Sequence, residues 1–123
     1  MKPLLSAVVI FVAACSSPEE DLETAAKASV ERQLRDPESA RYDDIQVWPE
    51  ERLVCGRVNA RNGFGGYTGF ELFAYAEGEG SATQSSGERF TRLHERCLAA
   101  SAAATARIQE ETNQIMNPLP TKG

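Results

Sequence analysis

Apolar residues recur every four positions in residues 22–35, and at three- and four-residue spacing from residue 88 to about residue 116. Both spacings place the apolar side chains on one face of a helix. The first helix ends before Pro37, because a residue that precedes proline disfavours the α conformation. The second has an alanine-rich middle, which favours helix, and ends at Asn117-Pro118. The apolar positions are Leu22, Ala26, Val30 and Leu34 in the first helix, and Phe90, Leu93, Cys97, Ala100, Ala104, Ile108 and Ile115 in the second.

Between the two helices, three stretches alternate between apolar and polar residues as β-strands do: residues 42–48, 52–60 and 67–76. Aromatic residues occur at both alternating positions of the third strand, which indicates that both faces of the sheet are covered, with one helix on each. In the first strand, alternation places Tyr42 and Trp48 on one face and Ile45 and Val47 on the other. In the second, it places Leu53 and Cys55 opposite Val54, Val58 and Ala60. In the third, it places Phe70, Leu72 and Ala74 opposite Tyr67, Phe73 and Tyr75.

Turn-forming residues connect these strands. Asn62-Gly63 is the strongest short hairpin signal, and we expect both residues to adopt a positive φ. The stretch 77–87 is rich in glycine and serine and predicts an exposed, mobile loop. The order helix, three strands, helix predicts an α+β domain, in which the long C-terminal helix packs on a three-stranded antiparallel sheet.

The first fifteen residues resemble the start of an exported bacterial protein. An apolar run at residues 4–14, interrupted only by Ser6, is too short to span a bilayer as a helix. The run ends in Val12-Ala13-Ala14-Cys15, which resembles the lipobox of bacterial lipoproteins. The resemblance implies that diacylglycerol is attached to the Cys15 thiol, that the chain is cleaved before Cys15 and that the new terminus is acylated. The alternative is an ordinary secretory signal peptide that contains a cysteine.

The residue after Cys15 indicates to which membrane a lipoprotein is sent. In the lipoproteins of enterobacteria, aspartate at this position favours the inner membrane, so Ser16 implies the outer membrane, with the domain on the periplasmic face. We therefore expect four segments along the chain: a signal peptide at residues 1–14, a lipidated tether at 15–21, a single α+β domain at 22–116 and a loose tail at 117–123.

The excess of acidic over basic residues disfavours nucleic acid as a partner. The chain has 13 Lys and Arg against 18 Asp and Glu, a net charge of −5. Removing residues 1–14 removes Lys2 and leaves 109 residues, enough for one domain with a modest core. An acidic chain gains no attraction to phosphate backbones, so nucleic acid is not an expected partner.

Three cysteines are an odd number for an exported protein. If Cys15 carries lipid, Cys55 and Cys97 remain as a pair in an oxidising compartment, and we expect a disulfide between them. Zinc is the poorer alternative, because two cysteines and His94 do not make four ligands with a recognisable spacing. The disulfide requires the last helix to lie on the Cys55 face of the sheet, or a bulge at Gly56 that re-aims the side chain.

The stretch CGRVNARNGFGGYTGF, residues 55–70, is rich in glycine and aromatic residues. It does not fit a nucleotide-binding loop, because Thr68 replaces the third glycine of G-x-G-x-x-G and a strand pattern follows. One interpretation is structural: the glycines shape a hairpin, and Phe64 folds back over its end. The other is functional: Asn59, Arg61, Phe64 and Tyr67 present a tip to a partner, since aromatic residues and arginine are enriched at interfaces.

Four short motifs resemble a small domain found in proteobacterial exported proteins and lipoproteins. They are DPESA at residues 36–40, VCG at 54–56, VNARN at 58–62 and FGGYTGF at 64–70. The resemblance implies a shared fold and an exported setting. It carries over no catalytic residue.

No set of residues suggests catalysis. His94 is isolated, Ser85 and Ser86 have no evident base, and Asp43-Asp44, adjacent in a strand, should point to opposite faces. We therefore predict a non-enzymatic lipoprotein without cofactor or metal, which acts as an interaction module for an envelope protein or polymer. The alternative is an inhibitor or sequestering protein for a hydrolase or small ligand, with the acidic loop Glu77-Gly78-Glu79 as its candidate site.

Overall fold

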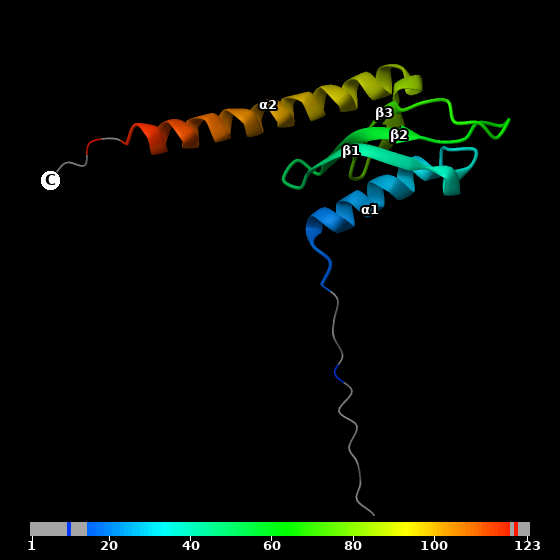
Figure 1. Cartoon of the computed structure of the whole chain (residues 1–123), viewed down its shortest axis with the longest axis horizontal. Coiled ribbons are helices and arrows are strands. Elements are labelled where there is room, and N and C mark those ends of the chain that lie inside the picture. Colours follow the sequence, from blue (N-terminus) through cyan, green and yellow to red (C-terminus); the bar gives the residue numbers. More distant parts are fainter. Residues whose placement is uncertain (1–9, 11–14, 119, 121–123) are drawn as a thin grey trace, which may run out of the picture.

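The computed structural model describes residues 10, 15–118 and 120 of the chain. It is an α+β domain, as predicted, in which two helices flank an antiparallel sheet of four strands in the order β1-β2-β3-β4 (Figure 1). The sequence predicted three of these strands. The elements are α1 (Pro18–Glu31), η1 (Pro37–Ser39), β1 (Arg41–Trp48), β2 (Leu53–Asn59), β3 (Glu71–Ala76), β4 (Gly80–Thr83), η2 (Gln84–Ser86) and α2 (Glu88–Met116).

Helix α1 begins at Pro18, four residues before the predicted start. Ser17 caps it: its hydroxyl accepts from the Glu20 backbone N–H, and the Glu20 carboxylate accepts from the Ser17 N–H. This capping box, with proline in the first turn, stabilises a helix start that apolar spacing cannot reveal. Much of the segment expected to be tether therefore belongs to the helix, and two residues separate Cys15 from Pro18.

Strand β4 and the short helix η2 occupy the stretch that was expected to be a mobile loop. The buried Ser81 explains the order. Its backbone N–H donates to the Ser29 hydroxyl at 3.1 Å, and its carbonyl oxygen accepts from the Gln33 side chain at 2.9 Å. These bonds attach β4 to Ser29 of α1 and to Gln33 just after the helix, so polar contacts to a distant segment hold a strand that has little apolar surface.

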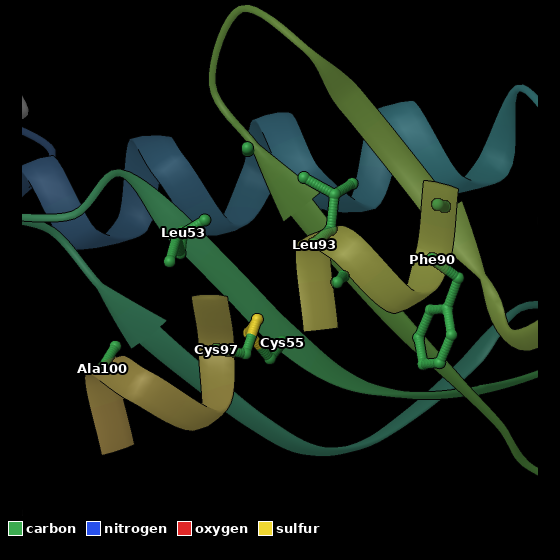
Figure 2. Close-up of a cluster of buried hydrophobic side chains, with 9 residues drawn as sticks. Leu53, Cys55, Phe90, Leu93, Cys97 and Ala100 are labelled. Atoms are coloured by element: carbon green, nitrogen blue, oxygen red, sulfur yellow. A yellow bond between two sulfur atoms is a disulfide. The ribbon is translucent and has the colours of Figure 1, made fainter. Parts of the chain in front are cut away.

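Each face of the sheet packs against one helix, as predicted. Helix α1 covers the face that carries Val54 and Phe73, and the first half of α2 covers the face that carries Leu53 and Cys55 (Figure 2). The α1 cluster contains Leu22, Ala26, Val30, Val54, Val58, Phe73 and Tyr75. The α2 cluster contains Leu53, Cys55, Ala74, Ala76, Ala82, Phe90, Leu93, Cys97 and Ala100.

Cys55 and Cys97 form a disulfide between β2 and α2, with their Cα atoms 6.3 Å apart (Figure 2). From the sequence, the bond required either the last helix on the Cys55 face of the sheet or a bulge at Gly56. In the structure, α2 lies on the Cys55 face. No re-aiming at Gly56 is needed.

Strand β1 contains a β-bulge that alternation did not predict. Asp43 pairs with Arg57 and Gln46 with Cys55, so two residues, Asp44 and Ile45, lie opposite Gly56. Asp44 has a φ of 49°, in the left-handed region. A bulge adds one residue and reverses the alternation beyond it. The prediction for Tyr42 was therefore wrong, because it packs on the same face as Ile45 and Val47, against α1.

Helix α2 extends well beyond the sheet. Its bounds match the prediction, but its buried residues end at Ala100, and the remaining turns project past the turn between β1 and β2 (Figure 1). Ile108 and Ile115, which the pattern placed on a buried face, are 65% and 82% exposed. Over residues 10, 15–118 and 120, no helix is both long and apolar enough to cross a bilayer.

Candidate functional site

The loop of residues 60–70 joins β2 to β3 at the end of the domain opposite the start of α1 (Figure 1). Asn62 organises the loop through its side chain, whose oxygen accepts from the backbone N–H of Phe64 at 2.9 Å and of Gly66 at 3.2 Å. The positive φ values fall at Gly65 and Gly69, not at Asn62 and Gly63. The predicted type of hairpin was thus wrong: Asn62 acts through an Asx turn, which needs no positive φ.

Two of the four residues predicted to face a partner hold the loop in place. The Tyr67 hydroxyl donates to the Ser39 carbonyl oxygen at 3.0 Å, which fastens the loop to η1. The Asn59 side-chain oxygen accepts from the Gly69 N–H at 3.1 Å. Their polar atoms are therefore used within the domain, and they position the residues that remain free.

Phe64 and Arg61 are exposed at this end. Phe64 is 100% exposed, so the expectation that it folds back over the hairpin was wrong. The Arg61 backbone N–H donates to the Ser39 hydroxyl at 2.9 Å, and its guanidinium lies 5.5 Å from the centre of the Tyr67 ring. An aromatic ring in full contact with water is costly, which makes Phe64 the clearest candidate contact residue.

Two further arginines join this end from segments that the sequence analysis did not connect with it. The Arg41 guanidinium lies 4.3 Å from the centre of the Tyr67 ring, and Arg35 Nη1 would lie 3.2 Å from a Cβ atom placed on Gly63. We call Arg35, Arg41, Arg61, Phe64 and Tyr67 the tip cluster. Within the part of the chain that the structure describes, none of its arginines is in a salt bridge.

The opposite end of the domain is acidic. Glu19, Glu50 and Glu51 line one hollow there, and Asp21 and Glu77 line another. The start of α1, which follows Cys15, lies at this end together with the β1–β2 turn (Figure 1). Arg107 and Arg52 line the same two hollows and pair with Glu50 and Glu77, so five carboxylates against two arginines leave this end negative. The tip end carries both signs of charge, because Asp36 and Glu38 lie in and next to η1.

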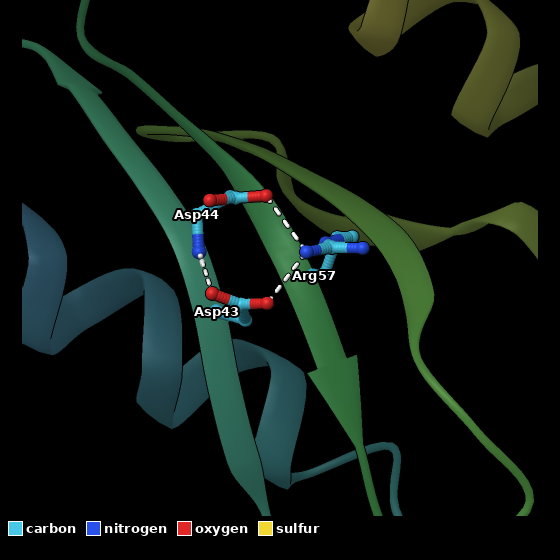
Figure 3. Close-up of polar contacts among 3 residues, drawn as sticks. All are labelled: Asp43, Asp44 and Arg57. Atoms are coloured by element: carbon cyan, nitrogen blue, oxygen red, sulfur yellow. Dashed lines mark hydrogen bonds and ion pairs between the residues drawn. The ribbon is translucent and has the colours of Figure 1, made fainter.

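A second polar group, on the sheet itself, is self-contained. Arg57 Nη2 lies 2.5 Å from Asp43 and 2.8 Å from Asp44 (Figure 3). The expectation that these carboxylates point to opposite faces was wrong, because the bulge in β1 turns both toward Arg57. The Phe70 ring lies 5.4 Å from the same guanidinium. Two carboxylates share one cation, so the group keeps a net charge of about −1 while its ion pairs hold both sides of the bulge together.

The residues considered for catalysis do not form a site. His94 stacks on Phe90, with ring centres 5.0 Å apart, on the flank of α2. The Ser85 hydroxyl and N–H both donate to the Glu71 carboxylate on the exposed surface. In the acidic loop, Glu77 pairs with Arg52 at 3.7 Å and Glu79 with Arg96 at 2.9 Å. That loop therefore presents paired rather than free carboxylates.

Comparison of the chain with protein-family models, with curated proteins and with solved structures found no match. The case for a function therefore depends on the chain's own residues. Val12, Ala13 and Ala14 of the lipobox-like segment lie outside the described residues, and Cys15 is described as a free, exposed cysteine.

Proposed function

We propose that this chain is a lipoprotein of the outer membrane, anchored through lipid on Cys15, and that it serves on the periplasmic side as an interaction module. Its contact site is the tip cluster. The observation that carries the proposal is the full exposure of Phe64 in the loop of residues 60–70, which lies opposite the start of α1 (Figure 1). An anchor and an exposed aromatic at opposite ends suit a protein that is held at a membrane and meets its partner away from it.

The short connection between Cys15 and α1 supports this orientation. Cys15 is exposed, and the Ser17 cap and Pro18 begin the helix two residues later. Two extended residues reach only about 7 Å, so a lipid on Cys15 would hold the acidic end of the domain near the bilayer. The tip cluster would then point into the periplasm.

An inhibitor or sequestering role receives less support. The acidic loop at residues 77–79 was its candidate site, and Glu77 and Glu79 are both paired with arginines. The tip cluster, by contrast, combines a fully exposed aromatic ring with arginines that lack carboxylate partners in the described part of the chain. Aromatic residues and arginine are the types that most often carry binding energy at protein interfaces.

In-cell photo-crosslinking tests the proposal. A photoreactive amino acid replaces Phe64 in one strain and Ile108 in another; Ile108 is a matched control because it is also apolar and exposed, but lies on the projecting half of α2. We expect a discrete cross-linked product from position 64 and a different pattern or none from position 108. Identical products from both positions, or none from position 64, would contradict the assignment of the site.

A further inference from the structure

We infer that the tip cluster recognises carboxylates, and that its partner is an acidic segment of another protein. This inference rests on the proposed function of the same site and adds the chemistry of the partner. The acidic net charge of the chain gave no indication of it, because the arginines concerned are separate in sequence and meet only in the folded domain.

The first argument is the distribution of ion pairs. Arg52, Arg57, Arg96 and Arg107 each lie within salt-bridge distance of a carboxylate. In the described residues, the three arginines of the tip cluster have no such partner, and neither do Arg32, Arg89 and Arg92. The tip arginines differ from these because they gather around one loop: Arg41 and Arg61 lie over the Tyr67 ring, and Arg35 lies beside Gly63. Asp36 and Glu38 lie in and next to η1, close in sequence to Arg35 and Arg41, but in the described residues neither forms a salt bridge with the cluster. The guanidinium groups of the cluster are therefore available to an anion from another molecule.

The second argument is the shape of the surface. Arg35 and Arg61 line one side of a hollow of about 420 Å³ between the end of α1 and the loop of residues 60–70. Asn62 and Thr68 add polar groups to its wall. Glu71 also lines it, but its carboxylate already accepts two hydrogen bonds from Ser85. Arg35 and Arg61 both line this hollow, and a guanidinium group can bind a carboxylate through paired N–H donors.

The third argument concerns preorganisation. The Tyr67 ring lies against the guanidinium groups of Arg41 and Arg61, and the Tyr67 hydroxyl is fixed to Ser39. Arginine side chains that stack on a fixed ring lose less conformational freedom when an anion binds. The cluster is therefore arranged for binding before the partner arrives.

Phe64 favours a protein segment over other anions. Its exposed ring lies on the same loop as Arg61. A polypeptide can place an apolar side chain next to carboxylates and so satisfy both, whereas free phosphate or the carboxylates of a glycan polymer bring no apolar side chain. The membrane that holds Cys15 would lie at the opposite end of the domain.

The test uses the full chain in a neutral detergent and a blocked peptide of glutamates around one phenylalanine, with a lysine peptide of the same design as control. Binding is followed by fluorescence anisotropy and by the amide shifts of residues 61–68. We expect the glutamate peptide alone to bind, and Arg35→Gln with Arg61→Gln to weaken it about tenfold or more. Arg92→Gln with Arg107→Gln, an equal change of charge on α2, should leave the affinity within about twofold.

The inference is overturned if the glutamate peptide does not bind, if the lysine peptide binds equally, or if both double variants behave alike. Arginine-dependent binding to peptidoglycan sacculi or inorganic phosphate, without binding to the peptide, also overturns it. The two proposals fail separately. If Arg35→Gln with Arg61→Gln leaves the cross-linked product from position 64 unchanged, the proposal of an interaction module is supported and the proposal of an acidic partner is contradicted. If the peptide binds as expected but position 64 captures nothing in cells, the preference of the site for carboxylates is supported, and its proposed use as a contact site in the cell is contradicted.

Discussion

Gly56 lies where β2 passes the bulge of β1, and it has almost no room for a side chain. A Cβ atom there would lie 3.1 Å from Phe73 Cε1 and 3.2 Å from Ile45 Cα. The second of these atoms belongs to the backbone, which cannot move aside as a flexible side chain can. A glycine at this position therefore permits the bulge and the buried Phe73 ring to coexist.

Replacing Gly56 by alanine should lower the free energy of unfolding by about 1–3 kcal/mol, because the added methyl group overpacks the α1 face. Gly66→Ala is the matched control: no atom lies within 4 Å of its Cβ position and its φ is not positive. We expect it to change stability by less than about 0.5 kcal/mol. Urea unfolding followed by circular dichroism measures both, and equal effects would refute the packing argument.

Tyr42 connects the bulged strand to α1. Its hydroxyl lies 3.1 Å from a Glu31 carboxylate oxygen and 3.3 Å from the Lys27 carbonyl oxygen, and its ring meets Phe73 edge-on at 5.9 Å. Burial, and then the charge and hydrogen bond of Glu31, raise the pKa of the Tyr42 hydroxyl well above its usual value. The folded state thus retains a proton that the unfolded chain loses near pH 10.

The protonated Tyr42 hydroxyl contributes to the free energy of unfolding, and this contribution is fully present below about pH 10. It falls as the pH rises above that value, because unfolding then releases the proton. Tyr42→Phe removes both the titration and the hydrogen bond. We expect the variant to be about 1 kcal/mol less stable than the natural protein at pH 7. The difference should shrink as the pH rises above about 10. Urea midpoints at several pH values provide the measurement, and a difference that stays constant would contradict the role of Tyr42.

At the scale of elements, α2 depends on a short contact with the sheet. Phe90, Leu93, Cys97 and Ala100 are its buried residues, and the later turns project into solvent. A helix held over only part of its length gains little from packing beyond that part. The bond between Cys55 and Cys97 lies within this contact and joins α2 covalently to a central strand.

Cys55→Ala with Cys97→Ala should therefore lower the free energy of unfolding by about 2–4 kcal/mol, chiefly because the unfolded chain regains the freedom of a loop that spans 42 positions. Thermal unfolding with and without reductant is the measurement. Reductant should destabilise the natural protein and leave the double variant unchanged. A natural protein that is insensitive to reductant would show that the bond does not form.

At the scale of the whole molecule, the domain has two chemically different ends. Acidic residues lie at the end where α1 begins, and the loop of residues 60–70, which carries the tip cluster's Arg61, Phe64 and Tyr67, lies at the other (Figure 1). Carboxylates at the first end would repel an acidic partner, whereas the tip cluster offers it arginines that have no carboxylate partner in the described residues.

Cys15→Ser tests the anchor at this scale. We expect the natural protein to sediment with membranes and to carry the added mass of lipid, and the variant to remain in the soluble fraction or keep its first fourteen residues. Since Cys15 is exposed and precedes α1, the variant's thermal unfolding should match that of the natural protein. A natural protein of unmodified mass would remove the basis for the proposed location.

Several features of the fold could be read from local patterns. The bounds of α2, the division of β2 between a Cys55 face and a Val54 face, and the coverage of each face by one helix all agree with the structure. Each depends on a repeat of two or 3.6 residues, which is written in neighbouring residues and needs no knowledge of the rest of the chain.

Other features arise from contacts between segments that are distant in sequence. Ser81 belongs to a strand because Ser29 and Gln33 reach it, and Asp43 and Asp44 converge because β1 pairs with β2 through a bulge. In the candidate site, the sequence indicated Phe64 and Arg61 but neither Arg35 nor Arg41. Periodicity reports which side of an element is apolar; it carries no information on strand register, or on which charges meet when separate segments pack together.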